Sequence, residues 1–197
     1  MPKFKIVTPC RRYNVPNILY KNLKPYTENY DIEWFIIYDT SSKIYNKDLN
    51  ESWIKQVSYR NEESQGGHDQ LNFSFQLFDE GIFFALDDDA LMHPRFFPAI
   101  KEYAEKTGKL GFLFHDQLKD DTIYPAYPHN IKVCVVGQQN FALDRKLIGD
   151  KRYDLPYCSD GVFIEELYNE RTNDFCFIDE ILAWHNRLRR ADWVDFV

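Results

Sequence analysis

The amino-acid sequence predicts an α/β protein built on a largely parallel β-sheet. Short apolar runs rich in strand-forming residues alternate with segments whose apolar residues recur at helical spacing. The chain has 197 residues, of which 44% are hydrophobic and 17% aromatic, which is enough for one domain with a large core. We find no internal repeat, low-complexity tract or linker, so residues 1–197 are interpreted as a single domain.

The first half of the chain contains four predicted strands. They are Phe4–Thr8, Glu33–Asp39, Val57–Arg60 and Gly81–Leu86. The first is closed by Pro9, and a helix follows behind Pro16, where apolar residues recur at helical spacing. A second helix follows the "QGG" that ends at Gly67, with Leu71, Phe75 and Phe78 on one face. The pattern is therefore strand and helix in alternation.

The second half continues this alternation. A helix from about Pro94 to Thr107 ends at Gly108, which is a good C-terminal cap residue. Strands are predicted at Leu110–Asp116, Asn130–Gly137 and Phe175–Ile178, with a loop between the first two and a helix at Asp160–Glu170 before the last. Strands separated by helices favour parallel pairing.

Charge and composition exclude several classes of protein. The net charge of −7 argues against general binding of nucleic acid or anionic membranes. No stretch approaches the ~20 apolar residues of a membrane span, and the N-terminus lacks a signal peptide's apolar segment. Four cysteines without the paired spacing of zinc or redox motifs favour a reducing compartment. We therefore expect a cytoplasmic protein.

The segment "FFALDDDALMHP" places three aspartates directly after a predicted buried strand. In an extended chain Asp87 and Asp89 point to one side and Asp88 to the other. Two close carboxylates repel each other unless a cation lies between them, and oxygen ligands suit Mg²⁺ or Mn²⁺ with a diphosphate. The alternative is a solvated acidic turn that caps the next helix.

The same segment resembles the Asp-x-Asp motif of the GT-A glycosyltransferases, which transfer a sugar from a nucleotide donor to an acceptor hydroxyl. The resemblance runs from about Lys5 to Arg190. It implies a GT-A-like, Rossmann-like three-layer α/β/α sandwich with a mainly parallel, mixed sheet. It also implies a UDP- or GDP-sugar donor, a glycan or other hydroxyl acceptor, and Mn²⁺ or Mg²⁺ as cofactor.

Further segments are similar to the nucleotide-sugar site of that family. "KIVTPCRRYNV" looks like its first strand and nucleotide-binding loop, and "GGHDQLN" like the segment that opens the helix before the acidic motif. The resemblance implies that Asp39 contacts the base or ribose, that Asp88 approaches the ribose, and that Asp87 contributes to the donor site. The remaining residues assigned to the donor site are Thr8, Pro9, Arg11, Gly67 and His68.

The resemblance also assigns metal and acceptor residues. Asp89 is expected to bind the metal directly, Asp87 to support its water shell, and His185 of "AWHNRLRR" to be a further ligand. "VGQQNFALDRKLIG" is similar to the acceptor-side segment. Asp160, at the start of a predicted helix, occupies the place of the catalytic base, and the alternative is that Ser159 or Asp160 caps that helix.

The main hypothesis is therefore a metal-dependent hexosyltransferase. A second is a nucleotidyltransferase or phosphohydrolase, which also brings carboxylates and a divalent cation to a phosphate. Against it, the chain has no Gly-rich phosphate loop with a lysine near its N-terminus. A third is a module that binds nucleotide sugars without turnover.

Overall fold

The computed structural model describes residues 2–12, 15–40, 45–60, 67–124, 127–128, 130–154 and 158–188. The strands are β1 (Lys3–Cys10), β2 (Asp31–Tyr38), β3 (Ile54–Ser58), β4 (Ile82–Ala85), β5 (Leu91–Met92), β6 (Gly111–Gln117), β7 (Ile123–Tyr124), β8 (Phe141–Asp144) and β9 (Phe175–Trp184). The α-helices are α1 (Pro16–Leu23), α2 (His68–Ser74), α3 (Phe96–Thr107), α4 (Arg145–Ile148) and α5 (Ser159–Arg171). Short 3-10 helices are η1 (Lys24–Tyr26), η2 (Gln138–Asn140) and η3 (Thr172–Asp174).

The described strands form one mixed sheet in the order β3-β2-β1-β4-β8-β6-β9-β5, with β7 paired to β6. The long ladders, such as β1 with β2 and β6 with β9, are parallel. The antiparallel ladders of β5, β7 and β8 are short. The predicted mainly parallel, mixed sheet is thus confirmed.

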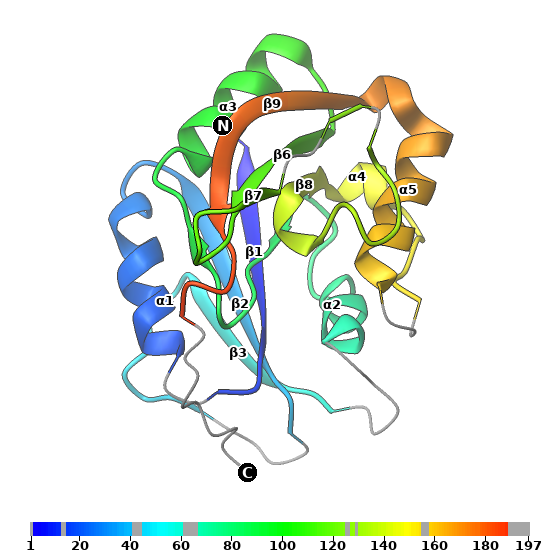
Figure 1. Ribbon diagram of the computed structural model, residues 1–197. Coiled ribbons are helices and arrows are strands. Elements are labelled where there is room, and N and C mark those ends of the chain that lie inside the picture. The colour runs from blue at the N-terminus through cyan, green and yellow to red at the C-terminus, as the bar shows by residue number, and fades with distance from the viewer. Residues whose placement is uncertain are drawn as a thin grey trace.

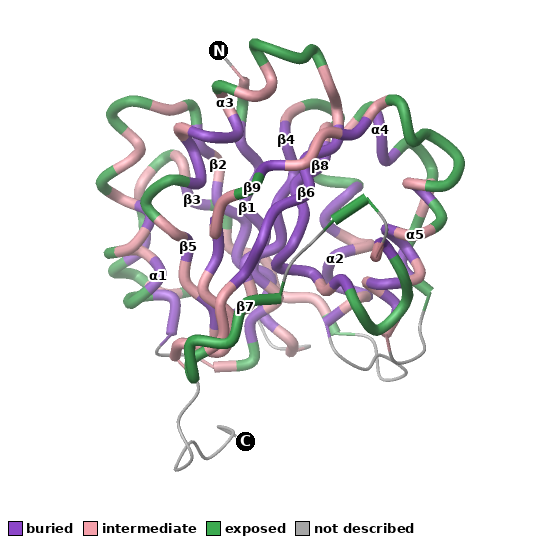
Figure 2. The backbone as a smooth tube through the Cα atoms, turned by 45° about the horizontal axis from the view of Figure 1, so that its top comes forward, coloured by how far each residue is buried: buried purple, intermediate pink, exposed green. Residues whose placement is uncertain are grey.

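Helices cover both faces of the sheet, as Figure 1 shows: α1 and α3 lie on one side, and α2, α4 and α5 on the other. Successive side chains of β4 point to opposite faces of the sheet, so this strand contributes to the cores on both faces. Phe84 packs into the α1/α3 core, whereas Phe83 packs into the α2/α5 core. Figure 2 shows the resulting buried sheet at the centre, with exposed segments around it. The predicted three-layer α/β/α architecture is confirmed.

Strand β1 is longer than predicted, because it continues through Pro9 to Cys10. The β1–β4 ladder ends at Val7, whose carbonyl accepts from Leu86 N–H, whereas the carbonyl of Cys10 accepts from Asp39 N–H on the β2 side. By alternation, the N–H that Pro9 lacks would face the side on which β4 has already ended. The proline therefore removes no ladder hydrogen bond.

The strand predicted at Asn130–Gly137 is wrong, because this segment contains a turn. Val135 N–H donates to Lys132 O at 3.1 Å, and Cys134 adopts a left-handed φ of 62°. Val133 and Val135 are exposed, so the apolar run has no buried strand face. The strand of this region is β8, within the segment that the sequence analysis assigned to the acceptor side.

The cysteine prediction is also corrected. Cys134 and Cys158 form a disulfide with Cα atoms 5.7 Å apart, while Cys10 and Cys176 are free. This pairing removes the argument for a reducing compartment that rested on cysteine spacing, and a cytoplasmic location stays an untested prediction. Within the described ranges, no helix combines the length and apolarity needed to cross a bilayer.

Thr8 lies in the core, where its hydroxyl accepts a hydrogen bond from the Trp34 indole N–H at 2.9 Å and both residues are fully buried. Thr8→Val keeps the side-chain shape but leaves the indole N–H without this acceptor. We expect the free energy of unfolding to fall by about 1–3 kcal/mol, measured by urea denaturation. In a Trp34→Phe background the same change should cost markedly less, and equal costs in both backgrounds would contradict the assignment.

Candidate functional site

A cavity of ≈ 360 Å³ lies where β1 and β4 end. Three segments distant in sequence form its wall: the residues at the end of β1, the N-terminus of α2 and the turn after β4. Its lining residues are Pro9, Arg11, Arg12, Gly67, Gln70, Asp87, Asp88 and Asp89. Because β1 and β4 are parallel, their carboxyl ends meet at the same edge of the sheet, where ligands of open α/β sheets bind.

The three aspartates form a turn rather than an extended segment, since Ala90 N–H donates to Asp87 O at 3.0 Å. The extended conformation expected for these three residues is therefore not found. Asp88 is buried and faces the β1 loop, where its Oδ2 accepts from Arg11 N–H at 2.9 Å and from Arg12 N–H at 3.2 Å. Its Oδ1 accepts from the Arg12 guanidinium. Asp88 therefore links Arg11 and Arg12, the loop after β1 (the β1 loop), to the turn formed by Asp87, Asp88 and Asp89 (the aspartate turn).

Asp87 and Asp89 interact electrostatically despite the turn. Burial first, and the negative charge of Asp89 second, raise the pKa of Asp87 to about 7, while His185 opposes the rise. The Arg12 guanidinium lies 3.7 Å from Asp89 Oδ2. The chain after β9 also reaches this turn, because Leu188 N–H donates to Asp89 O at 2.9 Å.

His185 follows β9 directly and connects a further carboxylate, that of Asp116, to the site. Its Nδ1 lies 3.2 Å from Oδ2 of the buried Asp116 on β6. Burial of His185 lowers its pKa, but the hydrogen bond to Asp116 and the charges of Asp87, Asp116 and Asp89 outweigh burial, so the pKa is raised. His185 is therefore close enough to the aspartate turn to be affected by its charge.

The donor types present fit a divalent cation, because Asp87 and Asp89 are like-charged oxygen donors with a histidine nearby. Among the described residues, however, no three histidine, cysteine, aspartate or glutamate side chains are arranged closely enough to hold a metal ion. A cation at this place would need ligands beyond these side chains, and Mg²⁺ ordinarily takes water and substrate phosphate as such ligands.

Two other predicted donor-site residues, Asp39 and His68, do not line the cavity but neighbour residues that do. Asp39, directly after β2, accepts from Arg11 Nε at 2.9 Å. His68 begins α2, and its ring stacks on Tyr153 with centroids 5.5 Å apart. Burial lowers the pKa of His68, although the charges of Asp160 and Asp69 oppose the shift. His68 therefore belongs to the side of the site that contains Asp160.

Asp160 lies in the first turn of α5, where its Oδ2 accepts from Gln138 N–H at 3.0 Å and its Oδ1 from Gly161 N–H at 2.9 Å. Neither Ser159 nor Asp160 occupies the N-cap position, which belongs to Cys158 and receives no side-chain capping bond. Burial, and to a smaller extent the charges of Asp160 and Asp87, raise the pKa of Tyr153. Tyr153 thus lies within electrostatic range of both carboxylates.

Several buried polar side chains lie around the donor cavity and Asp160, and of these only His68 and Ser159 were named from the sequence. Buried side-chain atoms without a hydrogen-bond partner in the described part of the chain include His68 Nδ1, Gln70 Oε1, Gln138 Oε1 and Nε2, Gln139 Oε1 and Ser159 Oγ. Such atoms are rare in folded proteins, and each costs about 1–3 kcal/mol. Buried polar groups of this kind are normally satisfied by ordered water or by a bound polar molecule. The only sequence signal is the polar "GQQN" between two apolar runs.

The raised pKa of Asp87 predicts that the stability of the protein depends on pH. Between its ordinary value of 3.8 and its folded value of about 7, the folded protein holds a proton that the unfolded chain has released. The free energy of unfolding, measured by urea denaturation in a chelator, should therefore fall as the pH rises through this range. Asp87→Asn should flatten this dependence, whereas the exposed Asp79→Asn should retain it. A wild-type slope in Asp87→Asn would contradict the prediction.

Searches with the sequence find neither a matching protein-family model nor a matching curated protein. Solved structures do match the fold. S. aureus TarS 1-349 superposes with a TM-score of 0.67 at 13% identity, covering 92% of this chain and 60% of TarS 1-349. Its complex with UDP-GlcNAc gives 0.66 at 12% identity, covering 92% of this chain and 58% of that one.

Glucosyl-3-phosphoglycerate synthase from Mycobacterium tuberculosis, in complex with phosphoglyceric acid, gives a TM-score of 0.63 at 12% identity, covering 92% of this chain and 71% of that enzyme. The chain thus spans about 60% of the TarS fragment and a larger share of the synthase. At this identity the likeness concerns the fold. The sheet order, the two helical layers and these superpositions together show that the chain has the GT-A, Rossmann-like α/β fold of TarS and glucosyl-3-phosphoglycerate synthase.

Proposed function

We propose that the chain is a metal-dependent glycosyltransferase that moves a sugar from a UDP- or GDP-sugar to a hydroxyl of a glycan or similar acceptor. The observation that carries the proposal is the cavity in which three aspartates and two arginines meet at the ends of parallel strands. The same fold in TarS has been solved with UDP-GlcNAc and with UDP. That likeness supports a nucleotide-sugar donor.

The donor's diphosphate would lie against Arg11 and Arg12. Each guanidinium already pairs with a carboxylate of the site, Arg11 with Asp39 and Arg12 with Asp88. A diphosphate offers them oxygen pairs of matching geometry. Asp87 and Asp89, with His185, would hold Mn²⁺ or Mg²⁺, which supplies Lewis-acid stabilisation of the charge that develops on the leaving nucleoside diphosphate.

The sugar and the acceptor would occupy the side of the site that contains Asp160. Gln138, Gln139 and Ser159 present buried polar atoms that sugar hydroxyls can satisfy. Asp160 is the carboxylate proposed to take the proton of the acceptor hydroxyl. Its hydrogen bonds to Gln138 N–H and Gly161 N–H orient this carboxylate.

Donor binding should require both the metal and Asp89. We expect calorimetry to detect a UDP- or GDP-sugar with Mn²⁺ present and to lose that binding with a chelator or in Asp89→Ala. Asp79→Asn, an exposed change before β4 and thus at the other end of that strand from the aspartates, is the matched control and should bind normally. If no nucleotide binds the wild type with metal present, the glycosyltransferase proposal is wrong.

A variant of Asp160 distinguishes a glycosyltransferase from a module that binds the nucleotide sugar without turnover. In Asp160→Asn the transfer rate should fall by about 10²- to 10⁴-fold, the usual contribution of a general base, because an amide cannot accept the proton. Donor affinity measured by calorimetry should stay within about twofold, as Asp160 does not line the donor cavity. Transfer at the wild-type rate in this variant would exclude Asp160 as the base.

A further inference from the structure

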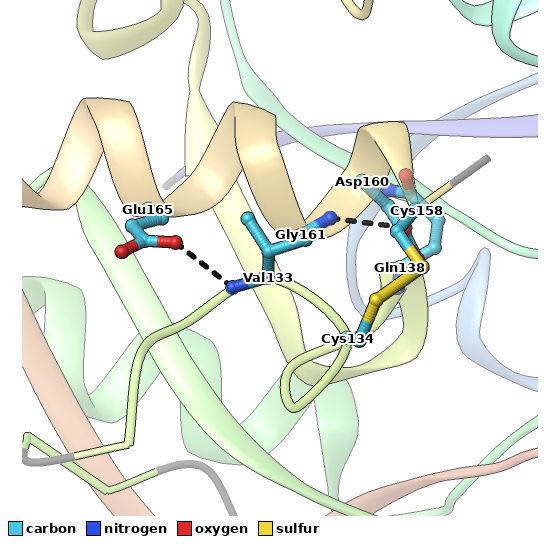
Figure 3. Close-up of a disulfide and its surroundings, with 7 residues drawn as sticks. All are labelled: Val133, Cys134, Gln138, Cys158, Asp160, Gly161 and Glu165. Carbon is cyan, nitrogen blue, oxygen red and sulfur yellow. Dashed lines mark hydrogen bonds between the residues drawn. A yellow bond between two sulfur atoms is a disulfide. The ribbon is translucent and has the colours of Figure 1, made fainter. Parts of the chain in front are cut away.

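The turn that precedes η2 is attached to the N-terminal half of α5 by two bonds (Figure 3). The Cys134–Cys158 disulfide joins the turn to the N-cap residue of the helix. About two helical turns further on, Glu165 Oε2 accepts from Val133 N–H at 2.8 Å. Turn and helix are thus connected by one covalent bond and one hydrogen bond.

Gly161 allows the turn to approach the helix between these two bonds. A Cβ added at Gly161 would lie 2.9 Å from both Cys134 N and Val133 Cα, which is closer than a side chain permits. Both cysteines also have left-handed φ angles, 62° for Cys134 and 66° for Cys158, which are uncommon for residues other than glycine. Such conformations persist where the surrounding structure over-determines them. The local backbone is therefore shaped around this contact.

The disulfide and Asp160 belong to one small ring of the structure. From Cys134 the chain runs to Gln138, whose N–H donates to Asp160 Oδ2, and from Asp160 it returns to Cys158 and the disulfide. Two short chain segments, one hydrogen bond and one disulfide thus close the ring. Breaking the disulfide opens the ring on the side opposite the carboxylate.

We propose that the Cys134–Cys158 disulfide positions Asp160. The disulfide holds the Asp160 carboxylate against the Gln138 N–H and beside the buried polar atoms of Gln138, Gln139 and Ser159. The consequence for transfer rests on the role proposed above for Asp160. The consequence for the hydrogen bond does not, because it concerns only the geometry of the turn and the helix. The two can therefore be tested separately.

Reduction is the direct test. A dithiol reductant donates two electrons and two protons, the S–S bond becomes two thiols, and the reductant becomes a cyclic disulfide. Cys10 and Cys176 are already free, so the reductant has no other disulfide to act on. Cys134→Ser/Cys158→Ser reproduces the reduced state without reductant, and Cys176→Ser on β9 is the matched control.

The first readout is amide hydrogen exchange at Gln138, which needs no activity. We expect exchange to accelerate about tenfold or more on reduction of the wild type and in the double variant, but not in Cys176→Ser. The global unfolding transition, followed in parallel, shows whether the change is local. Unchanged protection of Gln138 after reduction would overturn the proposal.

The second readout is the kinetics of transfer. The kcat should fall about 10- to 100-fold on reduction while donor affinity stays within about twofold, because a displaced base affects the chemical step. The double variant should not respond to reductant. Loss of Gln138 protection with an unchanged kcat would overturn the link to Asp160. If the oxidised wild type transfers no sugar, the proposed function fails, and the exchange measurement alone decides whether the disulfide positions the carboxylate.

Discussion

The hydrogen bonds between Asp88 and the backbone after β1 are the interaction on which the site depends. Burial raises the pKa of Asp88, and the N–H groups of Arg11 and Arg12 oppose this rise by stabilising the charged carboxylate. These bonds hold the β1 loop beside the aspartate turn, so that both arginines and all three aspartates line one cavity. The β1–β4 ladder brings the two loops near each other, and the Asp88 bonds fix their relative position beyond the end of that ladder.

Two other features of the site carry a free-energy cost that a bound ligand would reduce. Asp87 and Asp89 place like charges close together at a partly buried position, and near Asp160 several buried polar atoms lack partners. Both features oppose folding in the absence of a ligand, since a repelled carboxylate and an unpaired polar group each cost free energy. Sites of this kind are commonly functional, because binding of a cation and of hydroxyl groups removes the cost.

The sequence predicted the sheet strands well where apolar runs were long. β1, β2, β4 and β6 lie where expected, and Gly108 ends α3 with the left-handed φ of 65° that favours glycine. Prediction failed at short elements. β5 and β7 contain only two residues each, so their pairing depends on neighbouring strands, whereas β8 was missed although it is as long as β4. The run around Cys134 has strand composition, yet its turn and disulfide prevent any strand.

For the site, the sequence by itself determined the acidic motif and its place after a buried strand, because the order of residues sets which side chains follow β4. It also placed Pro9, Arg11 and Gly67 in segments that line the cavity. Only the tertiary structure decided that Thr8 faces the core, that Asp88 binds Arg11 and Arg12, and that His185 meets Asp116. It alone joined Cys134 to Cys158 beside Asp160. The physical reason is that hydrogen bonds and disulfides between distant segments depend on side-chain direction and distance, which local periodicity does not encode.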